Sequence, residues 1–179
     1  MERAENFEGR MRLMLRDANG AIVLERRAAN VVLRSGAELV AALFSGGAST
    51  PVNGVGVGVN ATPASVPYEA ATLTVTTPDG TPILQASAAP IDPATIQTQA
   101  LQDQLRIRVS LRSVIGPNRA VSPDDNVRTV EIAEAALGVL APDGNSLAQI
   151  YNRVVFEPVP KARDQELALY WEIDFPYGV

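Results

Sequence analysis

The segment QELALYWEIDF, residues 165–175, decides the fold. Apolar side chains occupy every second position of this segment, at Leu167, Leu169, Trp171, Ile173 and Phe175. Side chains of a β-strand point alternately to the two faces of its sheet, so a period of two predicts a strand with one face in the core. It is the longest alternation in the chain, and we therefore expect this strand at the centre of the core.

Two further segments predict hairpins. Residues 148–159, AQIYNRVVFEPV, lead into PKARD at 160–164, which we interpret as the loop of a hairpin with the strand at 165–175. Near the start of the chain, residues 10–16 (RMRLMLR) alternate in the same way and are followed by Asn19-Gly20. These two residues tolerate the positive φ of a tight turn, so a second hairpin is expected there.

Residues 105–114 form another alternating segment, and its polar positions are mainly arginines. Its two faces carry Leu105, Ile107, Val109 and Leu111 on one side, and Arg106, Arg108, Ser110 and Arg112 on the other. Three guanidinium groups on one sheet face suit a phosphate or an acidic partner. The alternative is a solvated strand whose charges discourage edge-to-edge pairing. We name Arg106, Arg108 and Arg112 as candidate interface residues.

One segment predicts a helix. Ser35 and Glu38 match a capping box, in which the Ser hydroxyl accepts from a helical amide and the Glu reaches back to the cap. Leu39, Val40, Leu43 and Phe44 then follow helical spacing, and Gly46-Gly47 ends the pattern. The sequence therefore predicts one short helix near residues 35–45, packed against a sheet.

The glycine-rich segment VNGVGVGVN, residues 52–60, is interpreted as a strand. A phosphate-binding loop would need a Lys-Ser/Thr pair and a helix directly after the glycines, and neither follows. Glycines alternate with valines instead, which leaves one face of the strand without side chains. We expect another backbone, a helix or a subunit to lie close on that face.

These elements predict a mainly β protein: a single-domain antiparallel β-sandwich over residues 1–179 with one short α-helix. Residues 62–98 are rich in Pro, Ala and Thr, with TPDGT at 77–81 as a turn between expected short strands at 68–76 and 83–86. The segment around 77–104 is expected to form an extended loop or arm.

Composition limits the chemistry. The 179 residues include no His, no Cys and a single lysine, Lys161. Imidazole-based acid–base catalysis, thiol nucleophiles, thiolate or imidazole metal sites and disulfides are therefore excluded. A DANG sequence at 17–20 lacks the remaining carboxylates of a calcium loop. We predict no catalytic residue, no metal site and no cofactor.

Charge and hydropathy limit the partners. The net charge is −5 and the sequence pI is near 4.8, which disfavours general nucleic-acid binding. No apolar stretch approaches the roughly 20 residues that span a bilayer, so no membrane association is expected. The first residues, MERAENFEGR, do not match a signal peptide, and we expect synthesis in the host cytoplasm.

Several segments, taken in order, resemble a family of bacteriophage tail and baseplate-associated structural proteins. They are Asn30-Val31-Val32 with the helix SGAELVAALFSG, the strand VNGVGVGVN, the strand VEIAEAALGVL, and the ending NRVVFEPVPKARDQELALYWEIDF. The family has an Asn-x-Val segment, a helix, a Gly-rich strand, a Glu-x-Gly-Leu-like strand and an Arg-x-x-Phe…Trp-x-Ile-x-Phe ending. This chain departs from it at Glu134-Ala135-Ala136-Leu137, where Ala stands in place of the usual Gly.

The resemblance implies a β-rich fold without catalysis or cofactor, and a place in a virion or contractile injection particle. Tail fibre adaptor, baseplate protein, neck protein and head decoration all stay open. The expected function is structural, through contacts to other copies of the chain and to neighbouring virion proteins.

Two other functions stay open. A carbohydrate-binding module that recognises a host-surface glycan would need exposed aromatic residues on one face; the candidates are Tyr68, Tyr151, Tyr170 and Tyr177. An enzyme acting through carboxylates alone would need two of them across a cleft. The candidate groupings are Asp124 with Asp125, Glu131 with Glu134, and Glu172 with Asp174.

Overall fold

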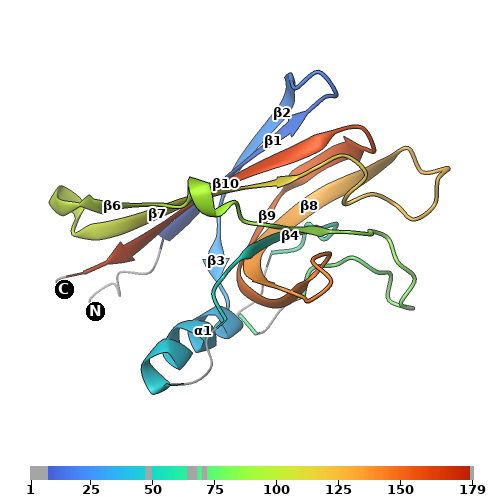
Figure 1. Cartoon of the computed structure of the whole chain (residues 1–179). Helices are drawn as coiled ribbons and strands as arrows, with labels where there is room; N and C mark the ends of the chain where they lie inside the picture. Colours follow the sequence, from blue (N-terminus) through green and yellow to red (C-terminus); the bar gives the residue numbers. More distant parts are fainter. Residues whose placement is uncertain (1–7, 47–49, 64–67, 70–71, 178–179) are drawn as a thin grey trace.

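Two five-stranded antiparallel sheets make up the fold (Figure 1). The computed structural model describes the chain except residues 1–7, 47–49, 64–67, 70–71 and 178–179. The strands of sheet A are, in order, β2 (Ile22–Ala29), β1 (Glu8–Arg16), β10 (Glu166–Pro176), β7 (Arg106–Ile115) and β6 (Gln97–Leu101). Those of sheet B are β3 (Val31–Val32), β9 (Leu147–Ala162), β8 (Thr129–Leu140), β4 (Gly54–Gly58) and β5 (Ala88–Pro90). The predicted mainly β sandwich is confirmed.

The core lies between the two sheets and centres on β10, as its alternation predicts. Trp171 is 1% exposed, and Leu167 and Leu169 are fully buried. Leu13 on the neighbouring β1 and Leu137 on β8 of the opposite sheet join the same cluster. The polar residues of β10 therefore point to the outer face of sheet A, where the candidate interface residues lie.

The first hairpin forms as predicted, but the second does not. Strands β1 and β2 pair through the turn at 17–20, where Gly20 has a φ of +82°. In contrast, β9 belongs to sheet B and β10 to sheet A, so the residues after Ala162 cross between the layers. Both strands have an apolar inner face. In a sandwich two such strands can either hydrogen-bond to each other within one sheet or lie in opposite sheets with their apolar faces in contact. Alternation alone does not distinguish the two arrangements.

The glycine-rich strand β4 is fully buried. Val55 and Val57 enter the core, and a Cβ on the opposite, glycine face would overlap side chains of the same chain. Leu140 and Leu147 lie over Gly54, and the carboxylate of Glu134 with the Thr74 carbonyl lies over Gly58. The expected close approach is present, and it is made within the chain.

The single described helix, α1 (Arg34–Ser45), occupies the predicted place, but its capping box is absent. The N-cap residue is Leu33, so Ser35 lies inside the first turn, where its buried hydroxyl donates to the Ile150 carbonyl of β9 at 2.6 Å. Glu38 pairs instead with Arg34 at 3.1 Å. Gly46 closes the helix with a φ of +71°, as predicted.

The region around 77–104 contains short elements instead of one continuous loop. Strand β5 forms one edge of sheet B and is followed by a short 3-10 helix, η1 (Pro93–Thr95). Strand β6 then forms one edge of sheet A and is followed by a second 3-10 helix, η2 (Gln102–Gln104). The turn at 77–81 forms, with the Gly80 amide donating to the Thr77 carbonyl at 2.9 Å. The expected short strands on either side of it are wrong, because the described residues there make only isolated bridges.

Candidate interaction face

The outer face of sheet A gathers arginines from two distant segments of the chain, residues 10–27 and 106–112. Strand register places Arg12 of β1 opposite Tyr170 of β10, and Tyr170 opposite Arg112 of β7. Arg27 of β2 lies opposite Arg12 on the other side. A single row across four strands therefore reads Arg27, Arg12, Tyr170, Arg112, with the tyrosine flanked by guanidinium groups.

We call this surface the arginine face. Its arginines are Arg10, Arg12, Arg27, Arg106, Arg108 and Arg112. The described carboxylates among them are Glu25, Glu172 and Asp174, and six positive charges less three negative charges leave +3. At one end of the same face Arg16 pairs with Glu166 at 3.3 Å, and this pair adds no net charge. The whole chain carries −5, so positive charge is concentrated on one face of an otherwise acidic protein.

The three predicted interface residues share this face but differ in their contacts. Arg108 binds Asp174 with two hydrogen bonds, at 2.7 and 2.8 Å, and lies 3.7 Å from Glu172. The guanidinium holds the pKa of the Asp174 carboxyl below its ordinary value, and the pKa of Arg108 rises in turn. Arg112 lies over the Tyr170 ring, 5.5 Å from its centroid. Arg106 is half-buried at the start of β7.

Beside Tyr170 the arginine face is hollowed by an open pocket of about 680 Å³. Its lining consists of Arg10, Met11, Arg12, Arg27, Ala28, Ala29, Tyr170 and Glu172. Arg12 and Arg27 share a single carboxylate, Glu25, at 2.8 Å each. Arg10 is exposed and makes no ion pair with another described residue. The hollow therefore presents more guanidinium groups than carboxylates to an incoming anion.

The tyrosines proposed for glycan binding do not gather on one face. Tyr151 is 5% exposed and packs in the core cluster, so it offers no surface. Tyr68 lies between β4 and β5, and its carbonyl accepts from the Arg34 amide at the start of α1; Tyr177 follows β10. Of the four candidates, only Tyr170 lines the hollow on the arginine face.

The candidate carboxylate pairs are held apart or neutralised. Glu131 is exposed, but Glu134 is fully buried and pairs with Arg153 at 2.6 Å. Asp125 pairs with Arg163 at 2.8 Å, while Glu172 and Asp174 both face Arg108. Among the described residues no group of three or more His, Cys, Asp or Glu side chains could hold a metal ion.

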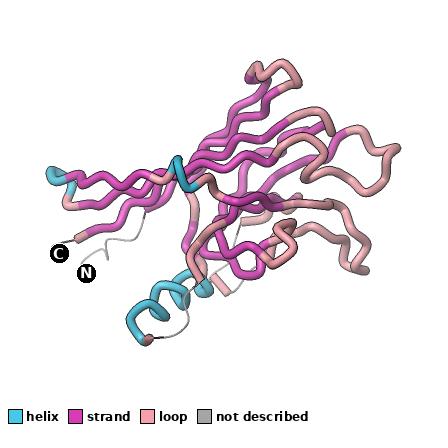
Figure 2. Tube along the Cα trace, viewed as in Figure 1, coloured by secondary structure: helices cyan, strands magenta, loops and turns pink. Residues whose placement is uncertain are grey.

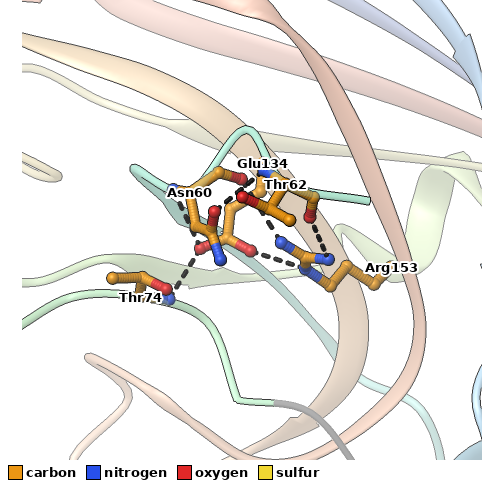
Figure 3. Close-up of polar contacts among 5 residues, drawn as sticks. All are labelled: Asn60, Thr62, Thr74, Glu134 and Arg153. Carbon is orange, nitrogen blue, oxygen red and sulfur yellow. Dashed lines mark hydrogen bonds and ion pairs between the residues drawn. The ribbon is translucent and has the colours of Figure 1, made fainter. Parts of the chain in front are cut away.

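A buried polar cluster around Glu134 is the feature that sequence reasoning missed (Figure 3). One carboxylate oxygen accepts from the Thr74 amide at 2.6 Å and the Asn60 amide at 3.3 Å, and the other faces Arg153. Arg153 in turn donates to the carbonyls of Thr62, at 2.9 Å, and Asn60. The cluster ties the segments beyond β4 to sheet B, and no spacing signal in the sequence links these residues.

No family model, curated protein or solved structure matches the chain significantly. None of the described helices is both long enough and apolar enough to cross a membrane. The function must therefore be argued from the surface itself.

Proposed function

We propose that the protein is a non-enzymatic structural component of a phage tail, baseplate or tail-like particle. It acts by self-association and by contacts to neighbouring virion proteins. The observation that carries this proposal is the segregation of charge: an arginine face of +3 on a chain of −5. Such a face fits an acidic surface of an adjacent subunit, and matching charges fix the register between partners.

Exposed carboxylates that could meet the arginine face are present on the same chain. Asp79, Asp124, Asp125, Asp143 and Glu157 are all exposed, and all lie outside the arginine face. A contact between two different surfaces of identical chains is heterologous, and it generates a closed ring when the rotation closes.

The tip of α1 adds a second candidate contact. Leu43 is 65% exposed and Phe44 is 88% exposed, although both belong to the apolar stripe of the helix. Figure 1 shows α1 projecting away from the two sheets. Large exposed apolar side chains on a projecting element are typical of protein–protein contacts.

The proposal is tested in cells that produce the particle. Immunogold labelling with an antibody against this chain should place gold at one fixed locus on tailed particles. Label confined to soluble material, with bare particles in the same field, would remove the assembly role.

A charge-reversal variant tests the arginine face. Arg10→Glu with Arg27→Glu should reduce incorporation into particles, and it leaves the Arg108–Asp174 pair intact. Arg34→Glu with Arg128→Glu is the matched control, because it makes the same change of charge at exposed positions off the face. Equal incorporation of the two variants would overturn the proposed contact.

A glycan-binding role is the second candidate, because Tyr170 borders the open hollow between guanidinium groups. An aromatic ring beside Arg side chains suits a sugar that carries a carboxylate. Glycan-array binding that Tyr170→Ala abolishes would support this function. An array with no bound glycan for the wild type would dismiss it.

A further inference from the structure

Strand β6 forms one edge of sheet A, and we propose that it pairs with β6 of a second copy of this chain. In the described part of the structure β6 pairs only with β7, so its other edge has no strand beside it. Four of its five residues are exposed. An open edge offers unpaired backbone N–H and C=O groups to another strand.

The other three edges carry the devices by which proteins prevent such pairing. Strand β2 has the charged run Glu25, Arg26 and Arg27, and its pairing with β1 is irregular near Arg16. Strand β3 has two residues, and β5 has three and ends at Pro90. In contrast, β6 reads QTQAL, with no charge and no proline. Its edge is the one left open to addition of a strand.

The surroundings of β6 leave room for a partner. Residues 106–110 of β7 are all half-buried, on both faces, although residues 111, 113 and 115 further along the strand are buried. Figure 2 shows β6 and this part of β7 extending beyond the strands of sheet B. Strand β6, this part of β7 and the end of β10 paired with it therefore project from the sandwich as a two-sided extension.

The chemistry of the strand identifies the partner as a second copy. In an antiparallel pair centred on a two-fold axis at Gln99, each Gln99 faces its own counterpart, Gln97 faces Leu101, and Thr98 faces Ala100. A charged strand would place like charges opposite each other in such an arrangement, which is destabilising. Strand β6 has none, and glutamine amides can hydrogen-bond to each other.

Neighbouring residues of β7 support the same pairing. On the outer face Arg108 lies beside Gln99, and Asp174 already neutralises it, so two copies would not repel there. On the inner face Val109 lies beside Thr98 and Ile107 beside Ala100. Pairing through β6 would place Thr98 of one copy opposite Ala100 of the other, between these apolar side chains, and would put no charged side chain at the inner face of the contact.

This contact is independent of the particle proposed above, because it predicts a two-fold dimer of the isolated protein. Light scattering and sedimentation should show a concentration-dependent dimer. Gln99→Lys, which puts two ammonium groups opposite each other, should weaken it several-fold. Val23→Lys is the matched control on the β2 edge, where Val23 is 52% exposed, and it should leave the dimer unchanged.

Single cysteines give a second readout that does not depend on weakening the dimer. The chain contains no cysteine, so Gln99→Cys would carry its only thiol. Opposed residues of an antiparallel pair bring their Cβ atoms to about 4.5–5.5 Å, close enough for oxidation to link two copies. Cysteines placed one at a time at positions 97–101 should cross-link most at Gln99, and Val23→Cys should not.

A monomer at every concentration, together with no cross-linking at any of the five positions, would overturn the inference. So would a dimer that Val23→Lys weakens as much as Gln99→Lys does. The arginine-face variant Arg10→Glu with Arg27→Glu should keep the dimer. Its loss from particles would therefore report on the proposed function alone.

Discussion

Arg108 of β7 holds Asp174 of β10 through two parallel hydrogen bonds, from Nε to Oδ1 at 2.7 Å and from Nη2 to Oδ2 at 2.8 Å. Asp174 is 4% exposed, so this guanidinium replaces most of the water that its carboxylate would otherwise bind. The geometry is the bidentate one that arginine forms best with a carboxylate. Among the six arginines that define the arginine face, Arg108 therefore contributes to the fold more than to an external contact.

Removing Arg108 should destabilise the protein. Arg108→Ala leaves the Asp174 carboxylate with little water and no bidentate partner, at a cost of about 1–3 kcal/mol in the free energy of unfolding. Urea denaturation measures this difference. Arg10→Ala is the control, because Arg10 is exposed on the same face and acts on Asp174 only by coulombic attraction, without a hydrogen bond, so its stability should stay close to that of the wild type. Equal stability of the two variants would contradict the stabilising role of the Arg108–Asp174 pair.

The same pair predicts a pH dependence. The pKa of Asp174 is lowered from 3.8, chiefly by its hydrogen bonds with Arg108. A carboxyl whose pKa is lower in the folded state stabilises that state above its unfolded pKa, and the stabilisation disappears as pH falls through the folded value. The stability difference between wild type and Arg108→Ala should thus be constant from about pH 5 to 7 and shrink below about pH 4. A difference that stays the same down to pH 2 would argue against the pair.

Removing one member of the buried pair Glu134–Arg153 should reduce stability strongly, whereas replacing both members with apolar residues should reduce it much less. Arg153→Met leaves a fully buried carboxylate without its cation, and a loss of about 3–5 kcal/mol is expected. In the double variant Glu134→Leu with Arg153→Met no charge remains, so the protein should regain much of the lost stability. The remaining loss should come from the backbone amides of Asn60 and Thr74, which no longer have the Glu134 carboxylate as acceptor. Denaturation of both single variants and the double variant completes the cycle. Additive losses would mean that the two residues act independently.

Alternation in the sequence predicts the long strands of sheet A, because burying one face of a sheet imposes a period of two, but it does not predict the short elements between residues 68 and 101. It predicted β1, β7 and β10, and with β10 the centre of the core. It could not predict sheet membership: β9 and β10 are consecutive and both amphipathic, yet they lie in opposite layers. The pairing register between strands that are distant in the sequence could not be predicted from alternation either. Arg106, Arg108 and Arg112 were found from one strand, whereas Arg10, Arg12 and Arg27 join them only through pairing of β10 with β1 and of β1 with β2.

The helix start illustrates how a local motif can be overridden by a tertiary contact. Ser35 and Glu38 have the spacing of a capping box, but the Ser35 hydroxyl donates to the Ile150 carbonyl instead. Ser35→Ala should therefore lower stability by about 1 kcal/mol through lost contact with β9. Glu38→Ala, which removes an exposed partner of Arg34, should change it little. Thermal denaturation distinguishes a capping box from a contact of Ser35 with β9, because in a capping box both substitutions would lower the stability.

Lys161, the only lysine of the chain, should limit stability at neutral pH. Its side chain is fully buried near the end of β9, and its Nζ donates to the Ala162 carbonyl at 3.2 Å. Burial lowers its pKa from 10.5 to about 8, an effect that Asp164 partly opposes. Between about pH 8 and 10.5 the unfolded chain holds a proton that the folded chain has released, so stability should rise with pH across this window.

Replacing the buried ammonium tests this directly. Lys161→Met keeps the length of the side chain and removes the charge, which should stabilise the protein at pH 7 by about 1–3 kcal/mol. The advantage should shrink as pH rises from about 8 to 10.5, because the folded wild type then releases its proton, and it should disappear above about pH 11.5, where the lysine is neutral in both states. Denaturation of both proteins at pH 7, 9 and 10.5 gives the comparison. A constant difference across this range would mean that Lys161 does not titrate differently in the folded chain, and that packing alone separates the two proteins.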